Sequence, residues 1–375
     1  MQNQSMAPLP LRPHQGTNNN EQIHRGLLAH GFTHGLAAAL LQHAELFAQR
    51  IWILDNSGSM QIGDGHRIVE TSDGKIEGQT VTRWEELQQT VLHHAEMAGV
   101  LNMQTHFRLL NYPGDRIGVQ EFTIAEESGD LAQEMRQTRN ILQRTKPAGV
   151  TPLTEHILNI EKTIRIFKQE LNESDNMVAI VIATDGLPTD STGEETEQVR
   201  WEFVNALKLL EDLPVWVVVR LCTSCEKVAQ FYNQLDSLLE LSLEVLDDHT
   251  GEAKEVVRHN KWLNYALPLH RCREVGFHHR VLDIIDERRL TLEELHEFCI
   301  ILFGETVRQW PDPALSWGDF ADRLKVHMAQ ERDHYDSTKG KMAPWINIRV
   351  LTQIYGKGGG GGTRGGVSRW LRFKK

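Results

Sequence analysis

The sequence has few cysteines, no long apolar run and no excess of basic residues. Four cysteines in 375 residues are too few for a disulfide framework. The longest clean apolar run, residues 177–183, is far shorter than the roughly 20 residues that span a bilayer. The first twenty residues lack a basic stretch followed by an apolar one, so we expect no secretory signal. We therefore expect a soluble protein of the cytoplasm, with the nucleus as the alternative, and no transmembrane segment.

The charge balance is acidic, with 40 Lys and Arg against 51 Asp and Glu and a net charge of -11. Binding to phosphate backbones requires Lys and Arg, so we expect no nucleic-acid binding by the core. Residues 356–375 differ, because they contain basic residues and glycines but no acidic residue. This tail could contact RNA or an anionic membrane, or it could be a solubilising linker.

Short apolar runs bounded by turn residues alternate with amphipathic segments, which predicts an α/β fold. Several runs are apolar on both faces, as in a doubly wound, mostly parallel sheet covered by helices on both sides. A β-hairpin is expected within residues 66–81, around Ser72-Asp73-Gly74. The expected strands are 50–55, 105–110, 119–124, 177–184, 215–221 and 243–245, and the expected helices are 84–101, 131–142, 152–171, 195–211 and 225–239.

The pattern of strands ends near residue 250, after which helices are expected over 252–267, 273–287, 291–303 and 317–332. Thr291 and Glu294 have the spacing of a capping box, and Gly304 suits a helix end. The expected organisation is a disordered tail (1–20), an N-terminal helical hairpin (21–48), an α/β domain (49–250), an all-helical region (251–350) and a flexible, Gly-rich basic tail (351–375).

Five oxygen-bearing side chains are placed where strands end or helices begin. Asp55, Ser57 and Ser59 follow the first strand as Asp-x-Ser-x-Ser, and Asp185 ends the strand 177–184. Thr151 precedes Pro152 at a predicted helix start, close to an N-cap. Ligands bind beyond the carboxyl ends of parallel strands, and hydroxyl and carboxylate donors suit Mg²⁺ or Mn²⁺ better than Zn²⁺.

These pieces, in this order, resemble the von Willebrand factor A family over roughly residues 49–250. The resemblance implies a metal-ion-dependent adhesion site in which Ser57, Ser59 and Thr151 bind the metal through their hydroxyls. Asp55 and Asp185 would bind it directly or through water, and an Asp or Glu of a protein partner would complete the coordination. The implied function is Mg²⁺-dependent protein–protein interaction.

Two departures from the family pattern leave alternatives open. Val150 stands where many members have glycine, so Thr154 competes with Thr151 for the threonine role, and the insertion at 61–82 could shape or cover the site. A metal-dependent hydrolase or phosphoryl-transfer enzyme is the alternative function, and a structural protein with an idle site is a third. We expect no enzyme, since no Walker-type loop or activated Ser-His pair is found.

Cys222 and Cys225 form a Cys-x-x-Cys motif after a predicted strand. A redox motif, or a zinc site with His270 and Cys272, is compatible with this spacing. Buried cysteines at the end of a strand are the more common interpretation.

Overall fold

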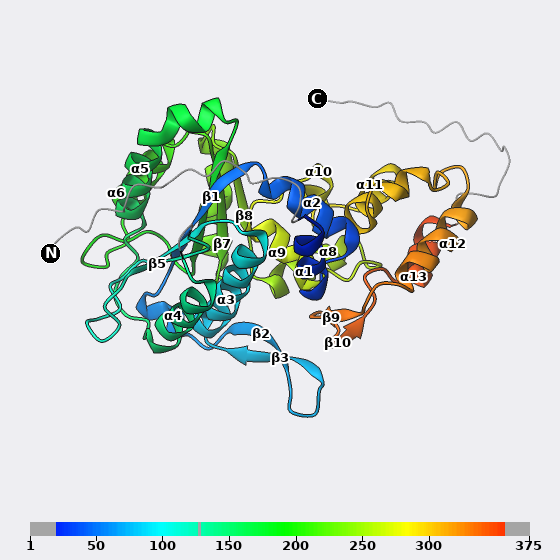
Figure 1. Ribbon diagram of the computed structural model, residues 1–375, viewed down its shortest axis with the longest axis horizontal. Coiled ribbons are helices and arrows are strands. Elements are labelled where there is room, and N and C mark those ends of the chain that lie inside the picture. Colours follow the sequence, from blue (N-terminus) through cyan, green and yellow to red (C-terminus); the bar gives the residue numbers. More distant parts are fainter. Residues whose placement is uncertain (1–19, 127–128, 357–375) are drawn as a thin grey trace, which may run out of the picture.

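A mostly parallel sheet forms the centre of the molecule, as predicted (Figure 1). The computed structural model describes residues 20–126 and 129–356. Six of the described strands lie in the order β5-β4-β1-β6-β7-β8, and only the pairing of β4 with β5 is antiparallel. The strands are β1 (Phe47–Leu54), β4 (Thr105–Leu109), β5 (Glu121–Ile124), β6 (Met177–Thr184), β7 (Val215–Leu221) and β8 (Leu243–Leu246).

Alternation along β1 directs its apolar side chains into two cores, one on each face of the sheet. Ile51 and Ile53 pack with the first core, and Trp52 and Leu54 with the second. The helices of the first face are α5 (Leu153–Glu173), α6 (Glu197–Lys208) and α7 (Glu226–Leu238), and those of the second include α3 (Arg83–Leu101) and α4 (Leu131–Arg144). The central strands are therefore buried on both sides.

The predicted hairpin is confirmed as β2 (Gly65–Glu70) and β3 (Ile76–Val81), which pair antiparallel. It runs from the start of α3 toward the C-terminal hairpin (Figure 1). There the Gly78 amide donates a hydrogen bond to the hydroxyl of Tyr335, at 2.9 Å. A Cβ on Gly65 would lie 2.7 Å from the carbonyl oxygen of Thr82, so the base of the hairpin is closely packed.

Two segments precede β1 as helices, α1 (Asn20–Ala29) and α2 (His34–Ala44). Helix α1 packs against α3, while α2 packs against α9 and α11 of the C-terminal region. The approach of α2 to α11 requires Gly35, because a Cβ there would lie 2.4 Å from the backbone nitrogen of Gly304. The predicted tail at 1–20 lies outside the described residues except for Asn20, which begins α1.

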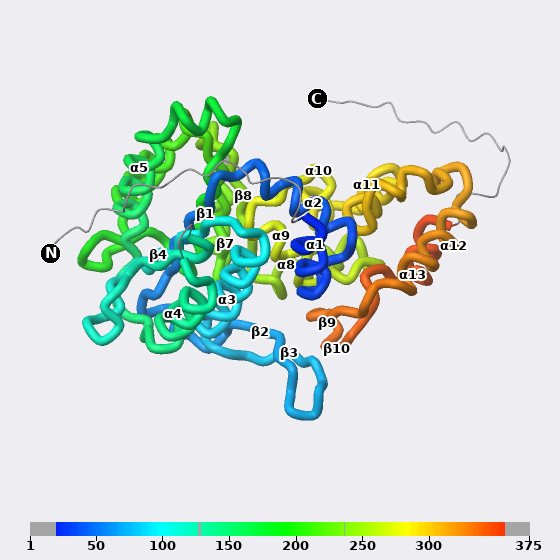
Figure 2. The backbone as a smooth tube through the Cα atoms, viewed as in Figure 1, coloured from blue at the N-terminus to red at the C-terminus, as the bar shows by residue number. Residues whose placement is uncertain are grey.

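The C-terminal region packs on the second face of the sheet and extends to the end of the molecule opposite α5 (Figure 2). Its apolar side chains join the core beneath α3. Its elements are α8 (His249–His259), α9 (Leu267–Glu274), α10 (Arg280–Ile284), α11 (Leu292–Phe303), η2 (Glu305–Gln309), α12 (Trp317–Met328), β9 (His334–Asp336), β10 (Lys341–Ala343) and α13 (Ile348–Tyr355).

The prediction of an all-helical C-terminal region is wrong, because β9 and β10 form a short hairpin. The helix expected over 252–267 ends early, since the side chain of Asn260 donates to the carbonyls of Ile285 and Arg288. The helix expected over 273–287 is interrupted at Gly276, whose φ of +86° is left-handed. The capping box of Thr291 and Glu294 is confirmed.

Helix α13 reaches Tyr355, so helical structure extends into the range 351–375 that was predicted as a flexible tail. Residues 357–375, with all the basic residues of the predicted tail, lie outside the described residues. Within the described ranges, no helix combines the length and apolar character needed to cross a membrane.

Candidate metal site

The first strand delivers Asp55 to the carboxyl edge of the sheet. Its backbone nitrogen donates to the Ala183 carbonyl at 2.9 Å, which extends the pairing of β1 with β6 by one residue. The side chain is fully buried. One carboxylate oxygen, Oδ1, accepts the amide of Ser57 at 2.8 Å, and Oδ2 accepts the hydroxyl of Thr184 at 2.6 Å. The Asp-x-Ser turn is therefore fixed by the aspartate itself.

Asp185 lies across from this turn, at the end of β6, and a chain of hydroxyls joins the two. The Ser57 and Ser59 hydroxyl oxygens are 3.0 Å apart, and that of Ser59 donates to Asp185 Oδ1 at 2.8 Å. Ser57 and Asp185 are buried, whereas Ser59 is exposed. The predicted donors thus meet in a site that opens to solvent at Ser59.

Burial raises the pKa of Asp55 to about 6, and the nearby charge of Asp185 adds to the shift. Hydrogen bonds from Thr184 and Ser57 oppose this shift. A buried carboxylate beside a second one is a favourable place for a cation.

Thr151 is brought to the same site by the loop before α5. A Cβ built on Gly186 would lie 3.8 Å from the Thr151 hydroxyl oxygen, so this hydroxyl lies beside the Asp185–Gly186 turn. The amide of Thr151 donates to the Thr189 hydroxyl at 2.9 Å. The amide of Gly58 donates to the Gly149 carbonyl at 3.3 Å, which joins this loop to the Asp-x-Ser-x-Ser turn.

Thr151 lies next to the N-cap of α5, as predicted, but the prediction of Pro152 as the first helical residue is wrong. Pro152 itself is the N-cap and α5 begins at Leu153, with no side-chain hydrogen bond at the cap. In the described part of the chain no hydrogen bond uses the Thr151 hydroxyl, whereas Thr154 lies in the first turn of α5 with its hydroxyl oxygen buried. The position of Thr151 beside Gly186 favours it over Thr154 as the metal donor.

Sequence reasoning missed Arg83, which is the first residue of α3. Its Nη1 donates to Asp185 Oδ2 at 2.8 Å, and its Nε and Nη2 donate to the two carboxylate oxygens of Asp64 at 2.7 Å each. The guanidinium holds the pKa of Asp64 below its usual range. Thr82 and Glu85 form a capping box that places Arg83 in the first helical turn. A positive charge in the first turn of a helix opposes the helix dipole, so Arg83 requires carboxylate partners. Its position after the capping box was therefore a signal in the sequence.

The insertion at 61–82 reaches the site through its base. Asp64 stands before β2 and pairs with Arg83, and the Arg83 amide donates to the Ile62 carbonyl at 3.0 Å. The strands of the hairpin run from there toward β9 (Figure 1). The insertion therefore shapes one side of the site through Asp64.

The donor set fits Mg²⁺ or Mn²⁺ in its chemistry. Asp55 and Asp185 supply carboxylates, and Ser57, Ser59 and Thr151 supply hydroxyls, all of them hard oxygen donors. Arg83 supplies one positive charge against the two buried carboxylates, which leaves a deficit of positive charge. Among residues 20–126 and 129–356, no group of three or more His, Cys, Asp or Glu side chains is arranged to hold a metal.

Cys222 is buried at the end of β7, and Cys225 is the exposed N-cap of α7. Burial raises the pKa of the Cys222 thiol to about 12, and its sulfur accepts a hydrogen bond from Arg220 Nη1 at 3.0 Å. A thiol held in its protonated form is a poor nucleophile and a poor metal ligand, which argues against the redox and zinc interpretations.

No family model matches the chain, and no curated protein matches it. The resemblance to von Willebrand factor A domains therefore stays a prediction from the motif residues.

Proposed function

We propose that this chain is a cytoplasmic binding protein of the von Willebrand factor A type. Asp55, Ser57, Ser59, Thr151 and Asp185 would hold Mg²⁺, and an Asp or Glu of a protein partner would bind the ion. The observation that carries the proposal is the convergence of these five side chains from three loops at one edge of the sheet. The ion supplies an electrophilic centre for a carboxylate oxygen.

The division of donors supports binding of an external anion. Three of the five are neutral hydroxyls, so they add no negative charge around the ion and leave it attractive to a carboxylate. Ser59 is the exposed member and marks the side from which a partner would approach. Asp55 is oriented by Ser57 and Thr184, which holds its carboxylate in place before the ion binds.

Metal binding is the first test, by Mn²⁺ titration followed with electron paramagnetic resonance. Asp55→Asn keeps the size of the side chain and removes its charge. We expect its Mn²⁺ affinity to fall by more than about a hundredfold, because even groups behind the metal ligands contribute about ten- to a hundredfold. Asp190→Asn is the matched control, since Asp190 is a partly buried carboxylate that accepts bonds within its own turn. Equal affinities in wild type and Asp55→Asn would refute the site.

Partner binding is the second test. Wild type and Asp55→Asn are used to capture proteins from a native lysate in Mg²⁺ and in chelator. A partner retained by wild type in Mg²⁺ alone should lose binding when one of its Asp or Glu residues is changed to the amide. Mg²⁺-dependent hydrolysis of a phosphate ester that Asp55→Asn abolishes would instead favour the hydrolase alternative.

A further inference from the structure

A second polar site lies beside the first turns of α3. It is a cavity of about 290 Å³ between the β2–β3 hairpin, α3, the end of β7, α8, α9 and the β9–β10 hairpin. Glu86 lines it, one turn beyond Arg83 of the candidate metal site. Its volume is close to the lower end of ligand pockets, at about 300 Å³.

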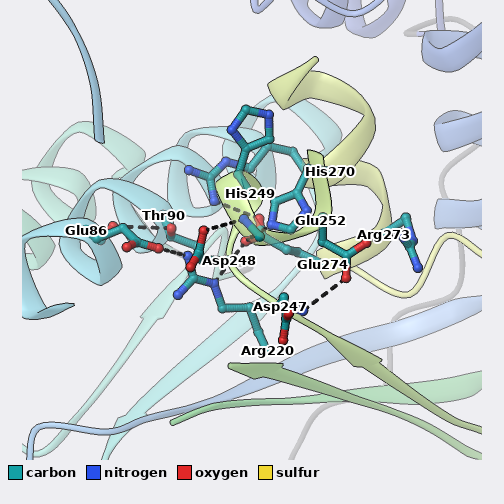
Figure 3. A network of polar contacts seen from close by, with 12 residues as sticks. Glu86, Thr90, Arg220, Asp247, Asp248, His249, Glu252, His270, Arg273 and Glu274 are labelled. Carbon is teal, nitrogen blue, oxygen red and sulfur yellow. Dashed lines mark hydrogen bonds and ion pairs between the residues drawn. The ribbon is translucent and has the colours of Figure 1, made fainter. Parts of the chain in front are cut away.

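The two carboxylates that pair with the buried arginines of the wall, Glu86 and Glu274, already accept bonds at both oxygens (Figure 3). Glu86 accepts the His66 amide at 2.8 Å through Oε2, and its Oε1 pairs with Arg220. Glu274 lies 3.3 Å from Arg220 through Oε1, and its Oε2 accepts Arg271 at 2.7 Å and His94 at 2.8 Å. Asp248, the N-cap of α8, accepts two backbone amides through Oδ1.

The cations of the wall, in contrast, keep unused donors. Arg271 is 5% exposed, and its Nε has no hydrogen-bond partner within the described residues. The same holds for Nε of Arg67, on the hairpin. Lys254 of α8 is exposed and has no ion pair in the described part of the chain. Three elements thus direct basic residues to one cavity, and the carboxylate that lines it, Glu86, is already bonded at both oxygens.

A purely structural role explains part of this arrangement. Arg220, Glu86 and Glu274 join the sheet and α3 to α9, and ion pairs satisfy them. That role accounts for neither the volume of the cavity nor the presence of Arg67 and Lys254 at its wall. A bound anion would use the donors that remain.

We propose that this cavity binds a small phosphate ester, with Arg67, Lys254 and Arg271 contacting the phosphate group. A phosphate dianion presents several strong acceptor oxygens, which suits a site with donors from three directions. The polar residues Gln79, Thr90 and Ser337 around the same cavity would face the organic part of the ligand. Contacts to both hairpins and to α8 would tie the insertion to the C-terminal region.

The test is calorimetric titration with ribose 5-phosphate, and with ribose as the uncharged control. Chelator is present throughout, so that phosphate held by a metal at the first site does not contribute. We expect a Kd of about 1 mM or tighter for ribose 5-phosphate and no binding of ribose. The Asp55→Asn variant should bind ribose 5-phosphate as wild type does.

The Arg67→Gln/Lys254→Gln double variant removes two partly or fully exposed cations and leaves the buried ion pairs in place. Its affinity should fall about tenfold or more, as expected for lost charge-assisted hydrogen bonds. Lys261→Gln is the matched control, because Lys261 is an exposed lysine just beyond α8 that does not line the cavity. Absence of binding to folded wild type, equal binding by the double variant, or equal binding of ribose would overturn the proposal.

Discussion

Two polar clusters lie one helical turn apart on α3 and balance their charges in different ways. At the candidate metal site, Asp55 and Asp185 face hydroxyls and the single cation Arg83, and the site opens to solvent. In the ion-pair cluster, Glu86 and Glu274 are matched by Arg220 and Arg271, and all four are buried. A buried cluster in which positive and negative charges are equal in number joins parts of the fold. A cluster with more negative than positive charges is suited to bind a cation.

The largest effect is expected from a substitution in the ion-pair cluster. Glu274→Gln leaves Arg271 without its carboxylate partner, and leaves Arg220 with Glu86 alone, at a position with no solvent access. We expect it to lower the free energy of unfolding by about 3–5 kcal/mol, because removing one member of a buried ion pair leaves an uncompensated charge. Urea denaturation measures this loss.

The control for Glu274→Gln is Glu255→Gln, which changes a carboxylate on α8 whose side chain is 43% exposed and lies 4.0 Å from Arg258. Exposed pairs contribute about 0–1 kcal/mol, so this variant should unfold nearly as wild type does. Similar losses in the two variants would contradict the contrast between buried and exposed pairs.

Acid should lower the stability of the fold through buried histidines near the ion-pair cluster. Burial lowers the pKa of His249 to about 3 and that of His94 to about 4, below the ordinary value of 6.5. From about pH 6.5 down to these values, the unfolded chain binds protons that the folded chain does not, so stability falls as the pH falls. At pH 5 each histidine should cost about 2 kcal/mol relative to neutral pH.

His249→Gln tests the pH dependence, because glutamine keeps a donor for the Tyr265 carbonyl that His249 contacts at 2.9 Å. Urea denaturation at pH 7 and pH 5 should show a smaller difference for this variant than for wild type. An unchanged difference would mean that His249 does not contribute to acid sensitivity.

A smaller effect is expected from the arginine at the metal site. Arg83→Gln removes the resident cation from Asp185 and Asp64. We expect Mn²⁺ affinity to rise about tenfold, equivalent to about 1.4 kcal/mol, because the arginine no longer competes for Asp185. Arg83→Lys retains the charge and should stay near wild type. Weaker metal binding in Arg83→Gln would show that Arg83 orients Asp185 for the ion instead of competing with it.

Local patterns predicted the elements well where propensity and burial agree. Continuous apolar runs at 177–184 and 215–221 are the central strands β6 and β7, and Thr291 with Glu294 begins α11 as expected. Predictions failed where a distant contact decided the conformation. Asn260 ends α8 by bonding carbonyls some 25 residues later, which no local pattern shows.

The residues of the candidate site were likewise predictable only where they are close together in sequence. Asp55, Ser57 and Ser59 are close in sequence, and their turn is fixed by a bond from Ser57 to Asp55, so the motif could be found directly. Arg83 is linked to Asp185 across 102 residues, and its role depends on where α3 begins after the hairpin. The helix-start signal at Thr82 indicated its place in the helix but not its partner.

The α/β order of elements, the hairpin and the oxygen donors at strand ends could be predicted from the amino-acid sequence, because these follow from periodicity and from residues near one another in the chain. The tertiary structure alone decided the pairing of Arg83 with Asp185, the buried Arg220–Glu274 cluster and the basic cavity beside it. The physical reason is that charges separated by many residues interact only after packing brings them together and removes the water between them.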